Sequence, residues 1–108
     1  MKNANLDQFL DNGWFSEATL YYKGYIYWCE GQWNYSKEKP MHFFVYRFPA
    51  KVVDEDYFER IPTNKPYEFM LDIWGNGEDD VREEFLKAKI FEGKSFWEVE
   101  KELAWLDE

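Results

Sequence analysis

The chain has 108 residues, the length of one folded domain, so we treat residues 1–108 as a single domain. Apolar residues make up 45% and aromatic residues 22% of the sequence, which excludes a disordered chain and supplies enough material for a core. With 22 acidic and 13 basic residues, the net charge is −9, which argues against direct binding to the phosphates of nucleic acid.

The cysteine content and the absence of long apolar runs bear on cellular location. The single cysteine, Cys29, excludes an internal disulfide and a zinc site built from cysteines. The first residues contain no apolar run of signal-peptide length, and no stretch has the length of a membrane span. We therefore expect a cytoplasmic protein that does not associate with a membrane.

The first predicted element is a short N-terminal helix. Leu6, Phe9 and Leu10 recur at helical spacing, Asn5 can serve as the N-cap, and Gly13 follows as a stop signal. The sequence therefore predicts a helix over residues 6–10.

A β-hairpin and a third strand are predicted next. Aromatic and β-branched residues form two runs, Thr19–Tyr22 and Tyr25–Cys29, and Gly24 between them can adopt the positive φ that a tight hairpin turn needs. A polar loop over 31–40 then leads into a strand over Met41–Phe48, which we expect Pro49 to end.

The following segment predicts one clear strand. Val52 and Val53 fit the beginning of a short strand, and the acidic run over residues 54–56 fits either a solvated turn or the first turn of a helix. Apolar and polar residues alternate along residues 67–74, which predicts a half-buried strand. The side chains expected on its buried face are Tyr67, Phe69, Leu71 and Ile73.

Two helices are predicted at the C-terminal end. The first starts near Asp79, where apolar residues follow at helical spacing and acidic residues complement the helix dipole. The second opens with a capping box, Ser95 to Glu98. Its expected apolar stripe is Phe96, Val99, Leu103 and Leu106. We predict an α+β fold, with a mostly antiparallel sheet of four or five strands, the short N-terminal helix, and these two helices as an αα-hairpin on one face.

Residues suited to catalysis are sparse, so we predict no enzymatic activity, no cofactor and no metal site. The one histidine, His42, lies in an apolar strand without a nearby nucleophile, and a packed histidine is the simpler interpretation. Cys29 lies between Trp28 and Glu30, which would raise its pKa and disfavour a reactive thiolate. The acidic clusters lack the spacing and central glycine of a calcium loop.

The distribution of charge suggests a partner instead. Residues 1–51 carry six basic and five acidic side chains, whereas residues 52–108 carry seven basic and 17 acidic ones. Carboxylates spaced along a helix can imitate the phosphates of a nucleic acid and occupy the basic groove of an enzyme that binds one. The acidic residues predicted to bind such a partner are Glu78, Asp79, Asp80, Glu83 and Glu84. The alternative is that these acids only keep the protein soluble.

The aromatic residues give a second clue to binding. Trp14, Trp33 and Tyr35 lie in or beside predicted loops, so we expect them to be accessible anchors for a partner. Helices can cover only one side of a single sheet, which would leave an aromatic face open unless loops bury it. The residues expected on that outer face are Tyr25, Tyr27, Phe44 and Tyr46.

These features lead to two functional hypotheses. The first is a non-catalytic inhibitor or accessory protein of a bacterial or phage conflict system, such as an immunity protein or an anti-defence, anti-CRISPR-type decoy that binds a nucleic-acid enzyme. The second is a β-module whose aromatic surface binds a ligand or a second copy of the chain as a homodimer.

Overall fold

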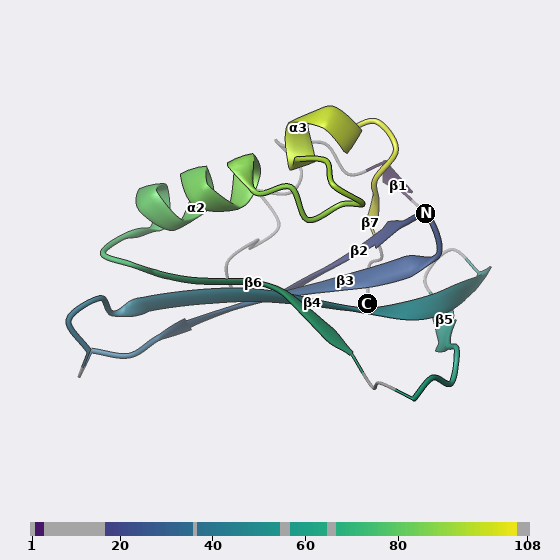
Figure 1. The fold of residues 1–108 in the computed structure, drawn as a ribbon, viewed down its shortest axis with the longest axis horizontal. Helices are drawn as coiled ribbons and strands as arrows, with labels where there is room; N and C mark the ends of the chain where they lie inside the picture. Colours follow the sequence, from purple (N-terminus) through teal and green to yellow (C-terminus); the bar gives the residue numbers. More distant parts are fainter. Residues whose placement is uncertain (1, 4–16, 36, 55–56, 65–66, 106–108) are drawn as a thin grey trace.

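The computed structural model describes residues 2–3, 17–35, 37–54, 57–64 and 67–105, and the fold is α+β (Figure 1). Its strands are β1 (Lys2–Asn3), β2 (Glu17–Tyr22), β3 (Tyr25–Trp33), β4 (Met41–Asp54), β5 (Tyr57–Arg60), β6 (Glu68–Gly75) and β7 (Ala104–Trp105), and its helices are α2 (Glu78–Lys87) and α3 (Phe96–Val99). Every strand pairing is antiparallel, in the order β1-β7-β2-β3-β4, with β5 and β6 also paired to β4. The expected antiparallel α+β architecture is confirmed, while the helix predicted over residues 6–10 lies outside the described residues.

The predicted hairpin is confirmed as β2 and β3. Tyr22 pairs with Tyr25, and the two turn residues both have positive φ, 46° at Lys23 and 88° at Gly24. This is the backbone geometry whose twist matches that of the flanking strands. β3 continues to Trp33, so the loop that follows it begins later than the sequence predicts.

The prediction that Pro49 ends its strand is wrong, because β4 runs on to Asp54. Pro49 sits where β4 changes neighbours: its last pair with β6 is at Arg47, and its first pair with β5 is at Ala50. The Pro49 carbonyl accepts a hydrogen bond from the Ile61 N–H at 3.0 Å. Proline has no N–H to donate, but Pro49 lies between the residues of β4 that pair with β6 and those that pair with β5. The strand can therefore continue through Pro49.

The predicted alternation of side chains along 67–74 fails at one point. A bulge in the pairing of β6 with β4 makes Tyr46 pair with Phe69 and Val45 pair with Leu71, which leaves Met70 as the additional residue. A bulge of one residue switches the side chains beyond it to the other face. Ile73 is buried as expected, whereas Phe69 is 65% exposed on the opposite face.

The second C-terminal helix is shorter than predicted. α2 starts one residue before Asp79, and the capping box of Ser95 and Glu98 is present at the start of α3. α3 is nevertheless a single turn, and the expected αα-hairpin is replaced by a helix, a helical turn and the strand β7. Leu103 is buried, as its place in the apolar stripe predicts, but the chain then pairs with β2 through Ala104. Strand pairing satisfies the backbone groups at the edge of β2, which a longer helix would not do.

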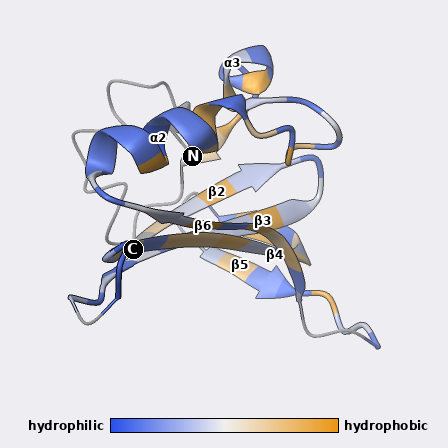
Figure 2. Ribbon diagram, turned by 60° about the vertical axis from the view of Figure 1, so that its left-hand side comes forward, coloured by the Kyte–Doolittle hydropathy of each residue, from blue (hydrophilic) through white to orange (hydrophobic). Residues whose placement is uncertain are grey.

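The main core lies between the helices and one face of the sheet (Figures 1 and 2). Its largest fully buried side chains are Tyr22, Tyr27, Phe43, Phe85, Phe91 and Phe96. A smaller buried cluster joins Ile26, Phe48 and Ala50. Within the described part of the chain, no helix is long and apolar enough to cross a membrane.

Candidate functional site

The residues predicted to bind a partner are exposed where the structure describes them. All five acidic residues lie on α2 with exposed side chains. Trp33 is 46% and Tyr35 82% exposed, and their rings stack with centroids 5.7 Å apart and planes 8° from parallel. Trp14 lies outside the described residues.

The fold brings the acidic helix and the predicted tryptophan together. A surface hollow of about 660 Å³ is lined by Trp33 together with Glu78, Asp79 and Asp80 at the start of α2. Antiparallel pairing places Trp33 at the end of β3, opposite the core residue Met41, on the side of the sheet that the helices cover. Residues more than 40 positions apart in the sequence therefore share one surface.

A second hollow continues this surface and includes a tryptophan that the sequence analysis missed. It has a volume of about 390 Å³ and joins Asp80, Glu83 and Glu84 to Trp74, at the end of β6. Trp74 is 39% exposed. The sequence does not single out Trp74 because it lies inside a predicted strand, where the alternation of residues does not tell which face of the sheet is covered. We call Trp33, Trp74, Glu78, Asp79, Asp80, Glu83 and Glu84 the acidic end surface. Lys39 and Lys87 also line the second hollow.

Part of the negative charge on α2 is neutralised within the helix. Arg82 pairs with Asp79, and Lys87 pairs with Glu83, both at 2.8 Å. The hydrogen bond from Lys87 lowers the pKa of Glu83. The other three acids, Glu78, Asp80 and Glu84, form no ion pair with the residues that the structure describes. With Lys39 also at the second hollow, five acids still face three cations, Lys39, Arg82 and Lys87. The acidic end surface therefore keeps a small excess of negative charge beside two exposed tryptophans.

The sheet face opposite the helices is aromatic, although its residues differ from those predicted. Phe44 and Tyr46 lie on it as expected, and Phe69 adds to them with ring centroids 6.4 and 6.2 Å away. The prediction for Tyr25 and Tyr27 is wrong: Tyr27 is buried in the main core, and Tyr25 packs against that core. The pairing of β3 with β4 sets their side chains on the helix side, because strand residues alternate between faces. We call His42, Phe44, Tyr46, Tyr67, Phe69 and Trp74 the outer aromatic face.

The side chain of His42 is held in place by two neighbours on β6. Its ring stacks on Trp74 with centroids 3.9 Å apart and planes 3° from parallel, and its Nε2 hydrogen-bonds to Asp72. Aromatic stacking and a carboxylate contact fix the orientation of the ring. Across the described ranges, no group of three or more histidine, cysteine or acidic side chains is placed to hold a metal ion.

Cys29 is inaccessible, and burial raises the pKa of its thiol above the ordinary 9.0. We expect a thiol reagent such as DTNB to modify the native protein about a thousandfold more slowly than the urea-unfolded chain, because reaction requires opening of the core. Above pH 9 the unfolded chain loses the thiol proton while the folded chain keeps it, so the free energy of unfolding should fall as pH rises.

Urea unfolding at pH 8, 9 and 10 measures this fall, with Cys29→Ala as the control that removes the thiol. Rapid modification of the native protein would show that the thiol is accessible. A pH dependence equal in both proteins would assign the titration to other groups.

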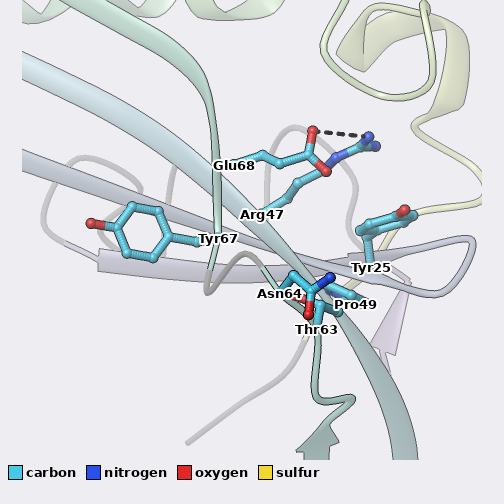
Figure 3. Close-up of a pocket in the computed structure, with 7 residues that line it drawn as sticks. All are labelled: Tyr25, Arg47, Pro49, Thr63, Asn64, Tyr67 and Glu68. Atoms are coloured by element: carbon cyan, nitrogen blue, oxygen red, sulfur yellow. Dashed lines mark ion pairs between the residues drawn. The ribbon is translucent and has the colours of Figure 1, made fainter.

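Arg47 forms a network that the sequence did not indicate. Its guanidinium donates to the Tyr27 hydroxyl at 3.1 Å and to Glu92 at 2.8 Å, and it lies 4.1 Å from the centre of the Tyr25 ring. Burial raises the pKa of Tyr27, which therefore stays a neutral phenol. Arg47 also forms an ion pair with Glu68 at 3.6 Å (Figure 3). The sequence contains no pattern that identifies this network, because it joins an arginine to aromatic and acidic residues of other segments.

This network borders a third hollow, of about 310 Å³, which Figure 3 shows with the residues that line it. Thr63 and Asn64 contribute polar side chains to it. The charge of Arg47 is already balanced by Glu68 and Glu92, so the hollow does not offer an unpaired cation to an anionic ligand. The Arg47 network ties β4 to β6 and to the turn after α2.

Comparisons with protein-family models, with curated proteins and with solved structures found no match to this chain.

Proposed function

We propose that this protein is a non-catalytic binding protein that captures a basic protein partner through the acidic end surface. The partner that fits this chemistry is a nucleic-acid enzyme, whose positively charged groove the carboxylates of α2 would occupy. Such a protein acts as an inhibitor or accessory factor in a bacterial or phage conflict system, and it works in the cytoplasm alongside the enzyme.

One observation carries this proposal: the acids of α2 and the exposed ring of Trp33 line the same hollow. Carboxylates steer a basic partner and make its binding sensitive to salt. Exposed tryptophan and tyrosine are enriched among residues that dominate binding energy. The stacked pair of Trp33 and Tyr35 supplies such anchors next to the charges.

Capture from a lysate of the source cells at about 50 mM and about 500 mM salt tests the proposal, because this change shortens the Debye length from roughly 14 to 4 Å. A supporting result is a nucleic-acid enzyme that is retained at low salt, is released at high salt and loses activity when the purified protein is added. Absence of any salt-sensitive partner would contradict the proposal.

Charge reversal locates the surface. We expect Asp80→Lys with Glu84→Lys to weaken capture about a hundredfold, since each reversal replaces an attraction with a repulsion. The matched control is Glu59→Lys with Glu102→Lys, which makes the same change in net charge at exposed positions on β5 and after α3. Equal loss in both double variants would mean that only the overall charge matters.

The outer aromatic face supports a second candidate function, a β-module that binds a ligand or a second copy of the chain. Phe69 is 65% and Tyr67 45% exposed, with ring centroids 5.4 Å apart. Salt does not screen apolar contact, so a partner that is retained at high salt and released by Phe69→Ser would favour this candidate. A partner that is released at high salt and still binds the Phe69→Ser variant would favour the acidic end surface.

A further inference from the structure

β6 forms one edge of the sheet in the described part of the chain. Its only strand partner there is β4. The Ala50 N–H donates to Gly24 at the side of β3, so alternation turns the backbone of Phe43 and Val45 toward β6. Their partners on β6 are Ile73 and Leu71, whose backbone groups are therefore used.

The residues between those two positions have the opposite orientation. The backbone N–H and C=O groups of Asp72 and Trp74 point away from β4, and they have no backbone partner among the described residues. Open donors and acceptors along a strand edge are a template for another strand. The bulge at Met70 confines regular pairing to residues 71–75.

The two sides of this edge differ in chemistry. On one side α2 lies along β6 (Figure 1), and Asp80 and Glu84 share a hollow with Trp74 and Gly75 at the edge itself. Lys39 and Lys87 also line this hollow, and Lys87 is paired with Glu83, so the carboxylates of Asp80 and Glu84 are the ones open to a basic side chain. On the other side lies the outer aromatic face. Alternate side chains of an added strand would therefore meet carboxylates on one side and aromatic rings on the other.

We propose that the edge of β6 binds an extended segment of the partner as an added antiparallel strand in which basic residues alternate with apolar ones. This inference rests on the proposed function and specifies how the basic partner is recognised. Backbone hydrogen bonds to Asp72 and Trp74 provide the register, and the alternating side chains provide the specificity.

Charge complementarity selects a basic segment over a second copy of the chain. The net charge of the protein is −9, and the pairing stretch of β6, residues 71–75, carries Asp72. Pairing β6 with another β6 would bring the two copies of Asp72 and the two α2 helices together, which like charges oppose. A lysine- or arginine-bearing strand meets the same surface with attraction.

The experiment uses a short fluorescein-labelled peptide in which lysine alternates with valine, and fluorescence anisotropy measures its binding to the full chain. In antiparallel pairing the valines lie opposite Asp72 and Trp74, so their N–H groups face β6. One control peptide carries N-methyl groups on the valines, which removes these donors but keeps the charges. A second control peptide replaces lysine with glutamate.

Two protein variants complete the test. Asp72→Pro removes the outward N–H without disturbing the bonds of Leu71 and Ile73 to β4, whereas Asp72→Asn keeps the N–H and removes the charge. We expect N-methylation and Asp72→Pro each to weaken binding about tenfold, Asp72→Asn to weaken it less than about threefold, and the glutamate peptide not to bind. Should Asp72→Pro fail to fold, as judged by circular dichroism, the N-methylated peptide on the unmodified protein decides the question.

Equal affinity for the parent and N-methylated peptides would overturn the strand-addition inference. If that binding still depended on Asp80 and Glu84, attraction by charge alone would remain, and the proposed function would stand. A chain that sediments as a dimer and becomes monomeric with Asp72→Pro would also overturn the inference, because a second copy would then occupy the edge.

Discussion

Replacing Phe85 with alanine is expected to lower the free energy of unfolding by about 3–5 kcal/mol, the range for truncation of a fully buried phenylalanine. Phe85 is 0% exposed and joins the sheet to the helices. Its ring centroid lies 5.3 Å from that of Phe43 on β4 and 5.9 Å from that of Phe96 on α3. The substitution would leave a cavity at the junction of both layers, which the surrounding rings cannot fill without moving.

Urea unfolding followed by tryptophan fluorescence measures this effect. Trp97→Ala is the matched control, because Trp97 is also an aromatic residue of the C-terminal region but is 54% exposed. We expect this control to change the free energy of unfolding by no more than about 1 kcal/mol. A loss below 1 kcal/mol for Phe85→Ala would mean that α2 does not pack on the sheet as described.

Replacing Arg47 with alanine is the second substitution with a large expected effect, about 2–3 kcal/mol of destabilisation. The Arg47 side chain is 14% exposed, and its hydrogen bonds reach Tyr27 and Glu92. Removing it leaves the buried hydroxyl of Tyr27 without this donor and removes the cation from the Tyr25 ring. Because Glu92 and Glu68 are nearly half exposed, water can solvate them, which keeps the loss below that of a fully buried pair.

Arg82→Ala is a control of the same chemistry at a different burial. Arg82 also forms an ion pair of 2.8 Å, with Asp79, but both side chains are more accessible. We expect a change of about 0–1 kcal/mol, the range of surface ion pairs. Arg47→Lys should restore part of the loss only, because an ammonium group cannot reach two acceptors in the geometry of a guanidinium. If Arg47→Ala and Arg82→Ala lowered the free energy of unfolding equally in chemical denaturation, burial would not determine how much each arginine contributes to stability.

Local patterns in the sequence were sufficient to predict several elements. Gly24 between two runs of aromatic and β-branched residues predicts the hairpin, because glycine readily adopts the positive φ of a tight turn. Ser95 and Glu98 specify the start of α3, since a capping box satisfies backbone donors within one turn. The start of α2 follows from apolar spacing and from the acids at its N-terminus.

Other features depended on neighbours distant in sequence. Pro49 can lie within β4 only because the strand changes partners there. The bulge at Met70 moves the side chains of Tyr67 and Phe69 to the opposite face of the sheet, and a methionine at that position does not predict a bulge. The C-terminal helix ends early because Ala104 finds a partner in β2, more than 80 residues away in sequence.

The same distinction applies to the candidate site. The sequence by itself determined that the protein is acidic and aromatic, that α2 begins with acids, and that Trp33 and Tyr35 are accessible, since these follow from composition and local spacing. Only the tertiary structure decided that Trp33 and Trp74 lie beside those acids, that Tyr27 belongs to the core, and that β6 is an edge of the sheet among the described strands. These are properties of strand order and register, which arise from pairing between distant segments rather than from the preferences of any one of them.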